Sequence, residues 1–75
     1  MKKQHLLPTI QLAVQNISML SQAKNQTVNV SCNEALILNH DRDWLAEALT
    51  NILKNATEYA PKDSTIDVTV ESTPV

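Results

Sequence analysis

Glycine is absent from this 75-residue chain, and cysteine occurs only once. Without glycine the chain has no P-loop, no GxGxxG turn and no nucleophile elbow. The single Cys32 excludes an internal disulfide and a cysteine-rich zinc site. No apolar run approaches the roughly 20 residues that span a membrane, and a net charge of −2 is too acidic for a nucleic-acid binder. We therefore expect one small cytoplasmic domain that contacts neither membrane nor nucleic acid.

Helical periodicity dominates the first third of the chain. Pro8 suits the first turn of a helix, because its missing N–H has no helical partner there. The apolar residues that follow recur at helical spacing and predict one buried stripe, made of Ile10, Ala13, Val14, Ile17 and Leu20. We expect a helix from Pro8 to about Lys24. Residues 1–7 precede it as a linker or as the start of the fragment.

Two short stretches after this helix have the pattern of strands. Residues 26–32 alternate, with Val28, Val30 and Cys32 on one face. Residues 35–38 form a second apolar run, and the two together predict a hairpin. A third alternating stretch, residues 65–71, comes near the end of the chain. The predicted order is helix–strand–strand–helix–strand, which favours an α+β two-layer sandwich with a mostly antiparallel sheet.

The second predicted helix runs from an N-cap at Asp41 to about Tyr59, and Pro61 stops it. One face is apolar and is expected to pack on the sheet; it holds Leu45, Ala48, Leu49, Ile52, Leu53 and Ala56. A polar stripe lies beside this face, spaced four, four and three residues apart, with Glu47, Asn51, Asn55 and Glu58. An asparagine amide at such a border offers an oxygen to a hard cation and an NH₂ group to a phosphate.

The segment from Asp41 to Pro61 resembles the N-box helix of sensor histidine kinases. The N-box is the first signature of the ATP-binding (HATPase) domain of the Bergerat fold, which these kinases share with gyrase-type ATPases. The family pattern is an acidic residue, a hydrophobic residue, Gln or Glu, NxxxNA, and an aromatic residue near a proline; here these are Asp41, Leu45, Glu47, Asn51, Asn55-Ala56, Tyr59 and Pro61. The resemblance covers nearly the whole chain, but only the N-box is specific.

The resemblance implies binding roles for three residues and a catalytic role for none. Asn55 would ligate the Mg²⁺ that bridges the ATP phosphates, Asn51 would help to order the phosphate end, and Tyr59 would lie beside the nucleotide. In gyrase-like relatives the position of Asn51 carries the acid that activates water, and an amide cannot act as a general base. Many family members have Lys or Arg where this chain has Glu58, so a phosphate contact is not implied there.

Two further family motifs are missing from the chain. The adenine-binding aspartate lies in a DxGxG motif and the ATP lid carries more glycines, and this glycine-free chain stops before both. We therefore expect residues 8–75 to be the N-terminal half of a histidine-kinase ATP-binding domain, inactive alone and with no bound ATP or Mg²⁺. The parent would autophosphorylate on a histidine of its dimerisation domain and pass the phosphate to a response regulator. His5 lacks the phosphoacceptor pattern, and His40 is expected in a turn.

Two other interpretations stay open. The chain could be a non-catalytic interaction module that pairs with a full kinase, or part of an anti-sigma-type protein-serine kinase, which also uses an N-box. Sequence beyond Val75 would separate them, because a DxGxG motif and a glycine-rich lid indicate an enzyme. The strand at residues 65–71 would leave an unpaired edge, and the core is small. We therefore expect a homo-oligomer, most simply a two-fold dimer.

Overall fold

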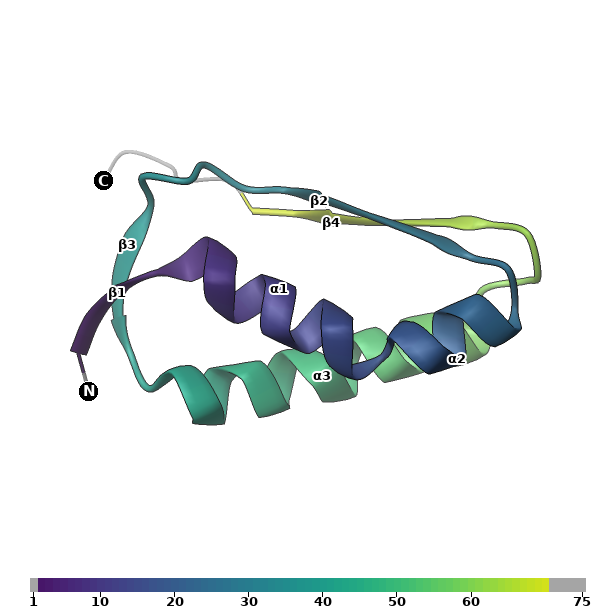
Figure 1. Ribbon diagram of the computed structural model, residues 1–75, viewed down its shortest axis with the longest axis horizontal. Helices are drawn as coiled ribbons and strands as arrows, with labels where there is room; N and C mark the ends of the chain where they lie inside the picture. Colours follow the sequence, from purple (N-terminus) through teal and green to yellow (C-terminus); the bar gives the residue numbers. More distant parts are fainter. Residues whose placement is uncertain (1, 71–75) are drawn as a thin grey trace.

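The computed structural model describes residues 2–70, which form two layers (Figure 1). The elements in chain order are β1 (Lys2–His5), α1 (Leu6–Asn16), α2 (Ser18–Ala23), β2 (Thr27–Ser31), β3 (Ile37–His40), α3 (Arg42–Tyr59) and β4 (Thr65–Thr69). In Figure 1, β2 and β4 run together along one side of the molecule, and the helices lie along the other. The expected two-layer α+β class is confirmed. The expected strand end at Glu71 lies outside the described residues.

The strands pair differently from the sequence-based expectation. β2 and β4 are parallel, with Val28 opposite Ile66 and Val30 opposite Val68. β1 and β3 form a separate antiparallel pair. The expected β2–β3 hairpin and the mostly antiparallel sheet are therefore wrong. Alternation within a strand determines which side chains face the core, but it leaves the partner and its direction open. α3 lies between β2 and β4 in the chain and supplies the crossover that parallel strands need.

The segment expected to be a linker, residues 1–7, belongs to the fold throughout its described part. β1 pairs with β3, and the backbone N–H of Leu6 donates to the carbonyl of Leu36 at 3.0 Å. α1 begins at Leu6, which is buried, and Pro8 occupies the third helical position. A backbone N–H at that position has no intrahelical acceptor, so the proline costs the helix nothing there.

The first predicted helix is broken in two at Ile17. The N–H of Ile17 bonds to the carbonyl of Val14 at 3.2 Å, one residue short of the α-helical spacing. The hydroxyl of Ser18 donates to the carbonyl of Gln15 at 2.8 Å. Serine hydroxyls compete in this way with the helical ladder and bend helices. The break turns α2 relative to α1 and leaves Leu20 exposed, although the sequence placed it on the buried stripe.

α3 begins and ends where the sequence predicts. The carboxylate of Asp41 accepts from the backbone N–H of Trp44 at 3.1 Å, which is the bond of an N-cap residue. The helix ends at Tyr59, and Ala60 is extended with ψ of 142°. A residue that precedes a proline disfavours helical geometry, so Pro61 explains this end. Both ends of the helix are therefore encoded locally.

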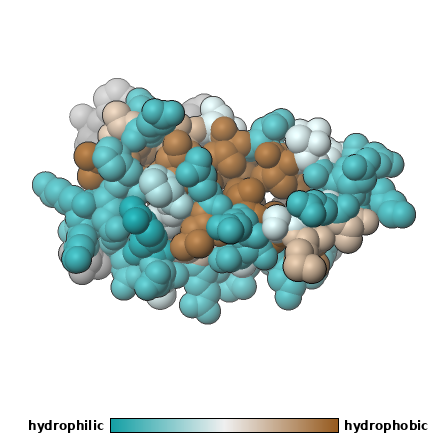
Figure 2. Space-filling model, viewed as in Figure 1, coloured by the Kyte–Doolittle hydropathy of each residue, from teal (hydrophilic) through white to brown (hydrophobic). Residues whose placement is uncertain are grey.

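The core lies where α1, α3 and the inner face of the β2–β4 pair meet. Its centre is Ala13, Ile17 and Leu53, against which Val14, Val28, Leu49 and Val68 pack. The apolar face of α3 is only partly covered: Leu53 is 7% exposed, but its neighbour Ile52 is 63% exposed. The expectation that Ile52 packs on the sheet is wrong, because α3 turns its buried side toward α1 and the sheet holds only two of the strands in residues 2–70. Figure 2 shows apolar side chains in a band across one face, bordered by hydrophilic surface.

Asparagine and aspartate take the backbone positions for which many chains use glycine. Asn25 and Asp63 have positive φ, 51° and 65°, and both side chains tolerate the left-handed region better than most. Asn25 ends α2 in a Schellman motif, since the N–H of Gln26 donates to the carbonyl of Ser21 and that of Asn25 to the carbonyl of Gln22. The amide of Asn25 also donates to the Asp63 carboxylate at 2.6 Å. The two turns are thereby joined without glycine.

Candidate functional site

The three residues that the sequence singles out lie on the open side of α3. Asn51, Asn55 and Tyr59 are four residues apart, so their side chains follow one another along one helix face. The structure leaves both asparagines exposed, and Tyr59 is 89% exposed. Glu47 and Glu58 of the same polar stripe are exposed as well. The structure thus brings the three predicted residues together on one surface, away from the packed side of the helix.

An uncovered apolar surface lies on α3 beside this row of amides. Helical geometry places the exposed Ile52 between the Asn55 position and the side of α3 that faces the sheet. Beyond it, an entirely apolar pocket of about 230 Å³ opens between the helices and β4, lined by Leu6, Ile10, Leu38, Leu45, Leu49, Val68 and Val70. Amides that border an apolar surface can orient a ligand whose remainder is apolar. The site is open rather than enclosed in this chain.

The C-terminal end of α3 is fastened by side chains from the loop before β2. The ammonium group of Lys24 donates to the carbonyls of Thr57, Glu58 and Ala60 at 2.8, 3.1 and 2.7 Å. The amide nitrogen of the buried Gln26 donates to the carbonyls of Thr57, Ala60 and Pro61 at 3.1, 3.1 and 3.3 Å. The last carbonyls of a helix lack intrahelical donors and carry partial negative charge, which a lysine satisfies well. The helix end that carries Tyr59 is therefore held in place.

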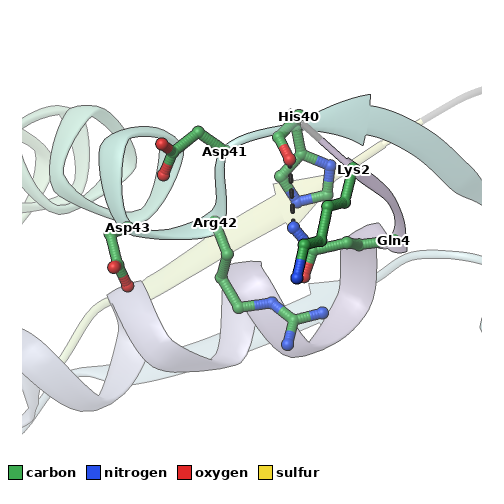
Figure 3. Close-up of a pocket in the computed structure, with 6 residues that line it drawn as sticks. All are labelled: Lys2, Gln4, His40, Asp41, Arg42 and Asp43. Carbon is green, nitrogen blue, oxygen red and sulfur yellow. Dashed lines mark hydrogen bonds between the residues drawn. The ribbon is translucent and has the colours of Figure 1, made fainter.

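A second polar cluster lies at the opposite end of α3, and the sequence did not predict it. The pocket there has a volume of about 300 Å³ and is lined by Lys2, Gln4, His40, Asp41, Arg42 and Asp43 (Figure 3). Lys2 and Gln4 come from the segment expected to be a linker. His40, expected in a turn, ends β3 and is 7% exposed. No local motif announces this cluster, because it joins β1 to residues more than thirty positions along the chain.

A network of hydrogen bonds holds His40 and Arg42 of this cluster in place. The Nδ1 atom of His40 lies 3.0 Å from the carbonyl of Leu38, and its Nε2 atom lies 2.9 Å from the hydroxyl of Thr9. That hydroxyl also accepts from Nε of Arg42 at 3.2 Å. A carbonyl only accepts, so Nδ1 carries a proton; we infer that the Thr9 hydroxyl donates to Nε2. The Nδ1–H of His40, the hydroxyl of Thr9 and the Nε–H of Arg42 are then all paired, and Arg42 is anchored to a threonine that is 0% exposed.

The chain matches known proteins by its fold but not by its sequence. No protein-family model and no curated protein matches the sequence. Among solved structures, the cytoplasmic segment of histidine kinase QseC matches with a TM-score of 0.83 and 24% sequence identity. The match covers 92% of this chain and 46% of that one, so the chain spans less than half of the matched structure.

Within residues 2–70, no helix combines the length and the apolarity that crossing a bilayer requires.

At 24% identity the structural likeness shows the fold alone. The described part of the chain therefore shares the fold of the matched part of that histidine kinase segment.

Proposed function

We propose that this chain is the N-terminal half of a catalytic ATP-binding domain of a cytoplasmic histidine-kinase segment, and that Asn51, Asn55 and Tyr59 form part of its nucleotide site. The observation that carries the proposal is the exposed row of these three residues on α3, beside an uncovered apolar surface. The fold match to a histidine kinase segment supports it. In this proposal the parent protein transfers phosphate from ATP to a histidine and then to a response regulator.

The donor atoms available on α3 suit magnesium that is held mainly by phosphate. Mg²⁺ takes oxygen ligands, keeps several waters, and is commonly held by one or two protein oxygens together with substrate phosphates. Asn55 supplies one exposed amide oxygen, and no group of three or more His, Cys, Asp or Glu side chains within residues 2–70 could hold a metal by itself. Asn55 would thus hold the ion against the phosphates, and the ion would neutralise their charge. Asn51 would orient the same phosphates through its NH₂ group.

The chain by itself should bind ATP·Mg²⁺ only weakly. Ligand pockets bury most of the ligand surface, whereas Asn51, Asn55 and Tyr59 lie on an open helix face. Calorimetric titration should therefore show no saturable heat at millimolar nucleotide. A micromolar dissociation constant would contradict the half-domain proposal.

The decisive experiment uses a kinase that contains this segment. Asn55→Ala removes the proposed metal ligand, and Asn55→Asp adds negative charge beside the phosphates. Both should abolish incorporation of radiolabelled phosphate while the circular dichroism spectrum stays unchanged. Glu58→Ala, on the same exposed stripe of the same helix but outside the N-box pattern, is the matched control and should keep most of the activity. Normal labelling in both Asn55 variants would show that the residue has no nucleotide role.

We also propose that the chain self-associates through its uncovered apolar surface. Ile52 and the pocket beside β4 leave apolar side chains in contact with water, and among the described strands β4 pairs only with β2, so one of its edges is open. Exposed edges and apolar patches both favour pairing with a second copy. Light scattering after size exclusion should give a dimer, and Ile52→Lys should shift it toward monomer. A folded wild-type monomer at high micromolar concentration would refute this proposal.

A further inference from the structure

The pocket at the N-terminal end of α3 is lined by two cationic side chains, those of Lys2 and Arg42. Figure 3 shows the side chains of Lys2, Gln4 and Arg42 converging, whereas the carboxylates of Asp41 and Asp43 point away on the other side. Like charges that converge repel one another unless an anion lies between them. The arrangement therefore has the polarity of a site for a negatively charged group.

Arg42 is held in a fixed position rather than left free on the surface. Its Nε donates to the hydroxyl of Thr9, which is itself buried and bonded to His40. This leaves the terminal nitrogens of the guanidinium group for a ligand. A planar guanidinium with fixed orientation matches the paired oxygens of a carboxylate or phosphate. The buried hydrogen bonds of Thr9 thus hold the guanidinium group of Arg42 at the pocket.

Backbone geometry adds to the same site. Arg42 and Asp43 occupy the first turn of the 18-residue helix α3, where N–H groups lack intrahelical acceptors and the helix dipole favours an anion. Gln4 is tied in by its own bond, since its amide nitrogen donates to the carbonyl of His40 at 3.0 Å. The carboxylate of Asp41 is engaged as the N-cap and faces the helix rather than the cations.

We infer that this pocket binds an oxyanion, a phosphate or carboxylate group, between the ammonium group of Lys2 and the guanidinium group of Arg42. The site is separate from the Asn55 row: Asn55 follows Arg42 by thirteen positions on α3, or about 20 Å at 1.5 Å per residue. It does not depend on the proposed nucleotide role. The pocket volume of about 300 Å³ accommodates an oxyanion.

The test is an NMR titration of the ¹⁵N-labelled chain with sodium phosphate and, separately, with sodium acetate, each against sodium chloride at matched ionic strength. We expect saturable shifts at the backbone amides of Gln4, Arg42 and Asp43 and at the Arg42 Nε–H. A response to phosphate alone identifies a phosphate site, and a response to both identifies a general oxyanion site.

Two variants and one control decide the outcome. Lys2→Gln and Arg42→Gln should each weaken binding at least tenfold, while Lys62→Gln, which removes an equal charge from an exposed turn, should leave it unchanged. Lys2 is exposed on a terminal strand, so its variant keeps the fold even if Arg42→Gln does not. Shifts that never saturate, or that are the same in Lys2→Gln and in Lys62→Gln, would overturn the inference.

Discussion

The two sides of α3 differ in how far their side chains pack against the rest of the protein. On the side toward α1, Leu53 lies in the core, and Thr57 is buried with its hydroxyl donating to the carbonyl of Lys54. On the other side Asn51, Asn55 and Tyr59 are exposed. Asparagine and tyrosine favour a helix less than alanine does. These three exposed residues are the ones that we propose to contact the nucleotide. The comparison can be tested by mutating each side in turn.

The largest effect should come from the packed side. Leu53→Ala removes a core side chain and leaves a cavity between α1 and the sheet, which should lower the free energy of unfolding by about 2–4 kcal/mol. Since a domain this small has little stability to lose, the variant should be largely unfolded at 37 °C by circular dichroism. A loss below 1 kcal/mol in urea titration would mean that the core is elsewhere.

The second largest effect on stability should come from the hydrogen bonds of Lys24 to the C-terminal end of α3. Lys24→Met keeps the aliphatic stem but removes three charge-assisted hydrogen bonds to carbonyls near the end of α3, so it should cost about 1–2 kcal/mol. Lys62→Met, at an exposed turn, is the matched control and should change stability by less than 0.5 kcal/mol. Chemical denaturation of both variants checks the difference, and equal midpoints would show that the three bonds contribute nothing net.

A substitution adjacent to Leu53 tests where the packed side ends. Ile52 is its neighbour in sequence but is mostly exposed, so Ile52→Ala should cost only about 0.5 kcal/mol, since little apolar surface leaves the core and alanine favours the helix. The measurement should be made at low protein concentration, where self-association does not contribute. A cost equal to that of Leu53→Ala would restore the sequence-based assignment of Ile52 to the buried face.

The smallest effect on stability should come from the open side. Asn55→Ala should leave the free energy of unfolding unchanged or raise it by about 0.5 kcal/mol, because alanine is the better helix former. The same substitution is expected to abolish autophosphorylation in a kinase that contains this segment. Thermal unfolding of the isolated chain provides the first measurement. A loss of more than 1 kcal/mol would show that Asn55 has a structural role, and the contrast between the two sides would fail.

Local signals predicted the parts of the fold that depend on neighbouring residues. The Asp41 cap, the stop at Pro61 and the row of Asn51 and Asn55 all follow from spacing within one helix. The partners of the strands did not follow, because β2 has the same alternation whether it pairs with β3 or with β4. β1 was missed because Lys2–His5 is polar and has no apolar alternation. Its place is set by β3, more than thirty residues away.

The candidate sites divide in the same way. The Asn51, Asn55 and Tyr59 row could be placed from helical geometry, and its exposure agrees with the polar stripe that the sequence shows. The pocket lined by Lys2 and Arg42 could not be placed, because the two residues reach the same pocket only when β1 pairs with β3. The exposure of Ile52 was also missed: periodicity identifies an apolar face but does not reveal how wide the covering sheet is.

The parallel pairing of β2 with β4 also has a consequence for the order of folding. Each pair of opposed residues in β2 and β4 is 38 positions apart in the chain. Forming the first pair therefore closes a long loop and costs entropy, which is offset only when further pairs form. Distant pairing of this kind slows folding. Docking of α1 on α3 joins residues equally far apart in the chain, but each helix forms from local contacts and docks through apolar side chains without requiring an exact register, whereas the strands gain their hydrogen bonds only when paired in register. We therefore expect the helices to associate first and the two strands to join last, so that the strand pair is the part of the molecule that opens most readily.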